Sequence, residues 1–131
     1  MIDKSAAVRI EGSPDRNLWL QRIQRGLICV STPTLLELGY SARTAADWAV
    51  NTRGALVSLM PLVYATPGSE RRAVELQGLA ALHGQHRAPS IPDLLIAALA
   101  EERGLTVLHL DHDFELIAHF TGQPTQRIRV A

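Results

Sequence analysis

Short apolar runs of strand length alternate with longer stretches of helical periodicity along this 131-residue chain, and this alternation constrains its fold more than any other feature. The run at 27–31 is almost entirely apolar, as is typical of a strand buried on both faces of a parallel sheet. Strands that alternate with helices predict βαβ units and a mostly parallel sheet. Because the length suits one domain, we expect a single α/β domain over residues 1–131.

The spacing of apolar residues, together with the Gly and Pro residues that end helices and strands, predicts where each helix and strand lies. The expected strands cover residues 1–2, 27–31, 62–65, 105–110 and 128–130. The expected helices cover residues 5–11, 15–25 and 69–86, then 93–103 and 111–120, with two further helices that begin near 33 and 44.

The composition limits the class of protein. Apolar residues make up 47% of the chain, which is enough for a core without disulfides, and the single Cys29 favours a reducing compartment. We see no secretory signal and no membrane span, so we expect a cytoplasmic protein. The net charge of zero disfavours a strongly basic nucleic-acid binder, although all but one of the 13 basic residues are Arg, which suits phosphate contacts.

Four acidic residues are expected to meet at one edge of the sheet. Asp3 and Asp111 each follow a predicted strand directly, Asp93 lies in the first turn of a predicted helix, and Glu37 lies one turn into another. The carboxyl ends of parallel strands and the N-termini of the returning helices share one edge, where ligands collect. Asp113 is a fifth candidate for this cluster.

Such a cluster needs a cation, because neighbouring carboxylates repel each other. No Lys or His cluster is placed to neutralise it, and Lys4 should point away from Asp3 if the chain is still extended there. An all-oxygen ligand set suits Mg²⁺, Mn²⁺ or Ca²⁺ and disfavours zinc.

Each acid also has a structural interpretation. Asp111 could cap the helix that it precedes, and Asp93 could close a capping box with Ser90. Pro33 at the first helical position would make Thr32 the cap, which leaves Glu37 beyond the box. We expect no such structural role for Asp3. Capping explains single acids well, but it explains four acids at one edge poorly.

Four short motifs resemble those of PIN domains. They are the opening Ile2-Asp3-Lys4-Ser5, the Thr32-to-Leu38 helix with its lone Glu37, the Ile91-Pro92-Asp93-Leu94-Leu95-Ile96-Ala97-Ala98 helix, and the strand end Leu110-Asp111-His112-Asp113-Phe114. The final Thr121-Gly122-Gln123-Pro124 resembles the tail of actinobacterial VapC toxins. The match covers nearly the whole chain in the right order and spacing.

This resemblance implies a three-layer α/β/α sandwich, a homodimer and a VapB-type antitoxin that lies over the active site. It implies that Asp3, Glu37, Asp93 and Asp111 are catalytic and hold Mg²⁺ or Mn²⁺, directly or through water. Asp113 would be an auxiliary ligand, and Ser5 a polar neighbour within the site that also caps a helix beginning at Ala6. Family members have several apolar residues before the first Asp, so we expect a first strand truncated at the N-terminus.

The histidines and Trp19 have competing interpretations. His109 or His112 could act as a general base or an RNA contact, but we favour a core residue for His109 and an exposed helix start for His112. We expect Trp19 in the core or facing a partner, with an antitoxin-binding role for residues 15–25 as a hypothesis.

The sequence therefore predicts the toxin of a type II toxin–antitoxin system, a Mg²⁺- or Mn²⁺-dependent endoribonuclease acting on tRNA or rRNA. One alternative is a catalytically silent PIN-fold binding module. Another is a phosphohydrolase that uses Asp111 and Asp113 as a D-x-D motif, but such enzymes need a Lys in the site, and Lys4 is the only one.

Overall fold

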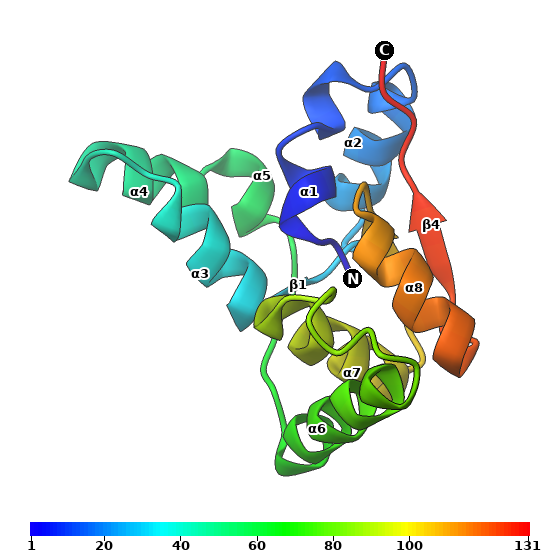
Figure 1. Ribbon diagram of the computed structural model, residues 1–131. Helices are drawn as coiled ribbons and strands as arrows, with labels where there is room; N and C mark the ends of the chain where they lie inside the picture. Colours follow the sequence, from blue (N-terminus) through cyan, green and yellow to red (C-terminus); the bar gives the residue numbers. More distant parts are fainter.

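The computed structural model describes all 131 residues as an α/β fold built on one parallel sheet (Figure 1). β1 (Val30–Ser31) pairs in parallel with β2 (Leu62–Val63), and β3 (Val107–His109) pairs in parallel with β4 (Thr125–Arg127). Ile2 forms parallel bridges to both Val30 and Leu108. The start of the chain therefore joins the two pairs and lies at the centre of the sheet.

Four backbone contacts hold this central segment. The amino group of Met1 donates to Thr106 O at 2.8 Å, and Leu108 N donates to Met1 O at 2.8 Å. Ile2 N donates to Cys29 O and Asp3 N donates to Leu108 O, both at 2.9 Å. Asp3 is therefore fixed at the point where the central strand ends, between β1 and β3.

Alternation along the strands sends side chains into two cores, one on each face of the sheet. On one face, Met1 and Val107 pack with the inner sides of α6 (Pro67–Leu82), α7 (Ile91–Arg103) and α8 (His112–Thr121). On the other face, Ile2 and Leu108 pack with α1 (Lys4–Ala7), the 3-10 helix η1 (Ile10–Gly12) and α2 (Arg16–Gln24). This arrangement confirms the three-layer α/β/α sandwich.

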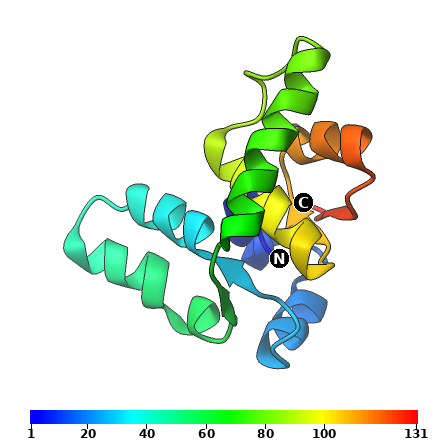
Figure 2. The same ribbon diagram turned by 90° about the horizontal axis from the view of Figure 1, so that it is seen from below.

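A helical hairpin extends away from the sheet. Figures 1 and 2 show α3 (Thr32–Tyr40) and α4 (Ala45–Arg53) as an antiparallel pair, with the short α5 (Ala55–Ser58) leading back to β2. A Cβ at Gly39 would lie 2.7 Å from Trp48 Nε1, so Gly lets the two helices approach closely. No residue of α4 is buried, so this helix leaves much apolar surface open.

The structure differs from the sequence prediction at the boundaries of three elements. Gly84 (φ 68°) follows the end of α6, so the helix ends at Leu82 and not at 86. The predicted helix 5–11 begins at Lys4 and divides into α1 and η1. The last strand is Thr125–Arg127 and not 128–130, because pairing with β3 starts directly after Pro124. Ile128 follows the strand as a buried core residue.

No helix of the structure combines the length and the apolar character needed to cross a membrane.

The packing of α7 predicts a sharp contrast between two isoleucines of the same helix. Ile96 is 0% exposed in the core, whereas Ile91 is 71% exposed. Ile96→Ala should lower the free energy of unfolding by about 2–5 kcal/mol, because it removes buried methyl groups and leaves a cavity. Ile91→Ala makes the same chemical change at the surface and should cost about 0.5 kcal/mol or less. Urea unfolding followed by circular dichroism measures both values, and equal losses would contradict this packing.

Candidate active site

An acidic hollow of about 410 Å³ lies beyond the carboxyl ends of the central strands. Its lining consists of Asp3, Lys4, Ser5, Val8, Arg9, Glu37, Ser90, Asp93, Asp111 and Asp113. The structure thus brings together every acid that the sequence predicted, together with Ser5. Four separate chain segments supply these acids, which confirms the predicted convergence at one sheet edge.

Asp3 is buried, with 3% of its surface exposed, and it has a structural role that the sequence analysis missed. It is the N-cap of α1, because its Oδ2 accepts hydrogen bonds from the backbone N–H of Ser5 (2.9 Å) and from the Ser5 hydroxyl. Its Oδ1 is also buried but has no hydrogen-bond partner. One oxygen therefore holds the helix, and the other is free for a ligand.

Ser5 connects the first helix to the end of β3. Its Oγ donates to Asp3 and accepts a hydrogen bond from Leu110 N at 2.9 Å. The prediction that Ser5 lies within the site is confirmed, whereas its expected role as an N-cap is wrong because Asp3 takes that role. Ser5 fixes the orientation of the Asp3 carboxylate toward the segment that carries Asp111.

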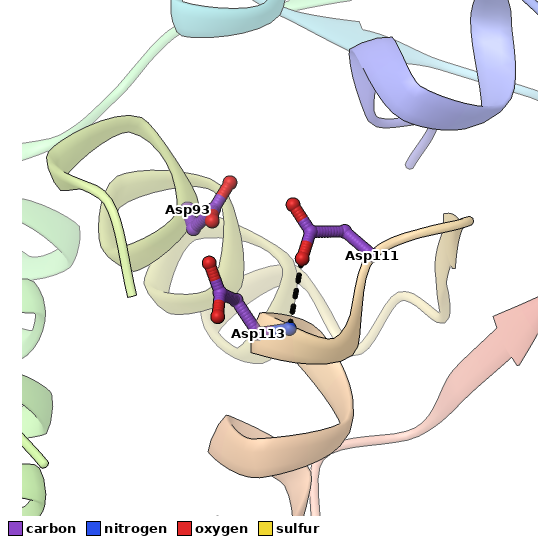
Figure 3. Close-up of side chains that lie close together, drawn as sticks. All are labelled: Asp93, Asp111 and Asp113. Atoms are coloured by element: carbon purple, nitrogen blue, oxygen red, sulfur yellow. Dashed lines mark hydrogen bonds between the residues drawn. The ribbon is translucent and has the colours of Figure 1, made fainter. Parts of the chain in front are cut away.

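Asp93, Asp111 and Asp113 face one another across the hollow (Figure 3). A carboxylate oxygen from each lies within 4.8 Å of the others. Asp111 caps α8, since its Oδ1 accepts from Asp113 N at 2.9 Å. In α7 the Ser90 hydroxyl accepts from the backbone N–H of Asp93 at 3.2 Å. The capping interpretation is therefore correct for Asp111, whereas Ser90 caps α7 without the reciprocal bond from its backbone N–H to the Asp93 carboxylate that a capping box would need. Carboxylate oxygens of both acids remain available.

Glu37 reaches the same hollow from α3. The cap of α3 is Ser31 and not Thr32 as predicted, because the helix begins one residue earlier and Pro33 occupies its second position. Glu37 still lies beyond the first turn, and its buried Oε1 has no hydrogen-bond partner. Burial raises the pKa of Glu37, and the Asp3 carboxylate raises it further, while Lys4 opposes both effects.

Crowding and burial shift two further carboxyl groups in the same direction. Burial, reinforced by the charge of Asp3, raises the pKa of Asp93 to about 7. Burial and the neighbouring Asp111 raise the pKa of Asp113. Three of the five acids thus resist ionisation, as expected for buried carboxyl groups that lie close to other carboxylates.

The donor set fits a hard divalent cation. Two of its buried oxygens, Asp3 Oδ1 and Glu37 Oε1, lack any protein partner, and buried polar atoms are normally satisfied. Every candidate ligand atom is a carboxylate oxygen, the donor type that hard divalent cations prefer.

The nearby histidines are not part of this donor set. His109 is buried beside Phe114, its Nδ1 accepts from Asp111 N at 3.1 Å, and burial lowers its pKa, which confirms it as a core residue. His112 is exposed and hydrogen-bonds to Glu115, as expected. Trp19 is buried at 4% exposure, so the core interpretation is correct.

Sequence reasoning missed two cations that line the hollow, Lys4 and Arg9. Lys4 was expected to point away, but the chain turns into α1 at this residue and is no longer extended. A single helical turn after Asp3 brings residues 4, 5, 8 and 9 around the hollow. The capping geometry of Asp3 is the signal that would have found them.

Comparison with known proteins identifies the family. A model of the PIN domain matches residues 1–119. The chain is 52% identical over 128 residues to the protein named Ribonuclease VapC2 of Mycobacterium tuberculosis, covering 98% of this chain and 91% of that one. This chain belongs to the PIN-domain family, in its VapC group. Ribonuclease VapC51 of the same species is 41% identical over 128 residues, with the same coverage of both chains.

Solved structures share this PIN fold. The toxin–antitoxin complex VapBC-5 from Mycobacterium tuberculosis matches with a TM-score of 0.62 and 27% identity, over 98% of this chain and 96% of that one. DNA-bound VapBC from Salmonella typhimurium matches with a TM-score of 0.76 and 21% identity, over 97% and 96%.

The raised pKa of Asp93 predicts how the stability of this PIN domain depends on pH without metal. The folded value of about 7 exceeds the unfolded value of about 3.9, so the favourable contribution is complete below about pH 4 and is lost as the pH rises through 7. Asp93→Asn cannot ionise and should stabilise the metal-free protein at neutral pH by a few kcal/mol, because each pKa unit between the unfolded and folded values corresponds to about 1.4 kcal/mol.

Urea unfolding in EDTA across this pH range measures the effect. Asp47→Asn is the matched control, because Asp47 also lies in the first turn of a helix but is exposed. In the control, the free energy of unfolding should depend on pH as strongly as it does in the wild-type protein. An unchanged pH dependence in Asp93→Asn would show that Asp93 does not carry this effect.

Proposed function

We propose that this PIN domain is the toxin of a type II toxin–antitoxin system and cleaves RNA as a Mg²⁺- or Mn²⁺-dependent endoribonuclease. The observation that carries the proposal is the acidic hollow, in which five carboxylates meet and two buried oxygens have no protein partner. The 52% identity to a protein named as a ribonuclease, over nearly the whole chain, supports the same reaction here. This function also fits a cytoplasmic location.

In this proposal Asp3, Glu37, Asp93 and Asp111 hold the metal, directly or through water, and Asp113 assists. A divalent cation bound there would supply a water of lowered pKa and withdraw charge from the phosphate under attack. Ser5 keeps Asp3 Oδ1 turned into the hollow, because it occupies Oδ2. The caps of α7 and α8 fix the backbones that carry Asp93 and Asp111. We propose tRNA or rRNA as the substrate class.

Cleavage of bacterial RNA by the purified protein tests the proposal. The protein should release discrete fragments with Mg²⁺ or Mn²⁺ and none with EDTA. Asp3→Asn, Asp93→Asn and Asp111→Asn should each lower the cleavage rate by at least about a hundredfold, since even residues behind a metal ligand are worth up to about that factor. Asp47→Asn, an exposed acid outside the hollow, should cleave normally.

A folded protein that cleaves no RNA with either metal would contradict the proposal and favour a silent PIN-fold binding module. Release of phosphate from monoesters, without internal cleavage of RNA, would instead favour the D-x-D phosphohydrolase.

We also propose a VapB-type antitoxin as partner and a homodimer as the assembly. An apolar groove of about 360 Å³ runs between α1, α3, α4 and α5, and it shares Val8 with the acidic hollow. A partner segment in this groove would cover the exposed face of α4 and reach the catalytic acids. A separate exposed apolar surface, which includes Leu36 and Tyr40, is our candidate for the dimer contact.

A charge placed in the groove should weaken the antitoxin complex. Val50 lines the groove and is 68% exposed, so Val50→Glu should leave the fold and RNA cleavage intact. It should raise the Kd for a VapB-type antitoxin about tenfold or more, because a carboxylate would lose water on binding. Leu82→Glu, at an exposed position at the end of α6, is the control and should bind normally. Equal affinity of both variants would place the antitoxin elsewhere.

A further inference from the structure

Two cations line the acidic hollow, and neither is held in an ion pair with its carboxylates. Lys4 and Arg9 both line the hollow beside five carboxylates. Even so, neither side chain forms an ion pair or a hydrogen bond, whereas Arg72, Arg127 and Arg129 all pair with carboxylates elsewhere on the surface. Their charges therefore remain available to a ligand.

The first helix holds these two cations at its opposite ends. Lys4 is the first residue of α1, and Arg9 directly follows its C-cap, Val8. The backbone between them is a single hydrogen-bonded turn, in which Val8 N donates to Lys4 O at 3.1 Å and Arg9 N donates to Ala6 O at 3.0 Å. α1 is anchored by the Asp3 cap, by the bond from Leu110 N to Ser5 Oγ and by Ala6, which is 0% exposed. The spacing between the cations is therefore set by a fixed element.

A polyanionic substrate would benefit from these two cations because the hollow is rich in acidic groups. The carboxylates of the hollow outnumber its two cations, so they repel the parts of a phosphate backbone that lie beyond the proposed metal, and cations along that path reduce the repulsion. Arg presents a planar fork that binds a phosphate with two hydrogen bonds, and Lys offers a compact point charge. Phosphate contacts of this kind position a nucleic acid without reading its sequence.

We propose that Arg9 and Lys4 are positioning residues that bind RNA backbone phosphates on either side of the bond to be cut, with Arg9 as the main contact. This inference rests on the proposed ribonuclease function. The two cations act on the substrate and take no part in holding the metal. Loss of either should raise KM much more than it lowers kcat, because the carboxylates remain in place.

The test measures binding of a fluorescein-labelled oligouridylate by fluorescence anisotropy, in an Asp93→Asn background that cannot cleave it. Affinity is measured between about 50 and 200 mM salt. Arg9→Gln should raise Kd about tenfold and reduce the slope of log K against log salt by about 0.7, the value for one phosphate contact on a single strand. Arg9→Lys should recover part of the affinity. Lys4→Gln should also reduce the slope.

Arg71→Gln is the matched control. Arg71 is exposed on α6, unpaired and outside the hollow, so this variant loses the same charge without the proposed contact. If Arg9→Gln and Arg71→Gln give the same Kd and slope while the wild-type protein cleaves RNA, the positioning role is overturned and the ribonuclease function stands. If the wild-type protein neither binds nor cleaves RNA, both proposals fail.

Discussion

Repulsion among carboxylates at one edge of the sheet is the constraint on which the rest of this structure depends. Burial and crowding raise the pKa of Glu37, Asp93 and Asp113, so the folded protein stores an unfavourable interaction in its metal-free state. The surrounding fold must hold these groups in place. The central strand at Ile2, bonded on both sides, and the two cores on either face of the sheet supply that rigidity.

The same carboxyl groups cap helices and line the acidic hollow. Asp3 caps α1 and Asp111 caps α8, and in each case one oxygen holds the helix while the other is left for the hollow. An N-cap side chain lies where the strand has just ended, which is also where ligands collect in parallel α/β folds. Each of these acids can therefore cap a helix and still offer an oxygen to a ligand in the hollow. The capping bonds orient the carboxylates before any ligand arrives.

The sequence predicted the α/β class, the parallel sheet and the convergence of Asp3, Glu37, Asp93 and Asp111, because strand ends and helix starts share one edge whatever the details of packing. It misplaced the last strand, because the apolar residues Ile128 and Val130 look like a strand. In the structure the chain turns at Gly122 after α8, and the residues that pair with β3 begin at Thr125. It missed Lys4 and Arg9, because their positions depend on Asp3 starting a helix at once. The apolar groove beside α4 depends on how the α3–α4 hairpin and α5 pack near the first helix, which periodicity does not encode.

If the carboxylates form one site for a divalent metal, anomalous diffraction from crystals grown with Mn²⁺ should reveal the ion. We expect a Mn²⁺ peak within the hollow, coordinated by Asp3 Oδ1 and by carboxylate oxygens of Asp93 and Asp111, with Glu37 bound directly or through water. Ordered carboxylates with no peak among them, or a peak only elsewhere on the protein, would contradict the proposed metal site.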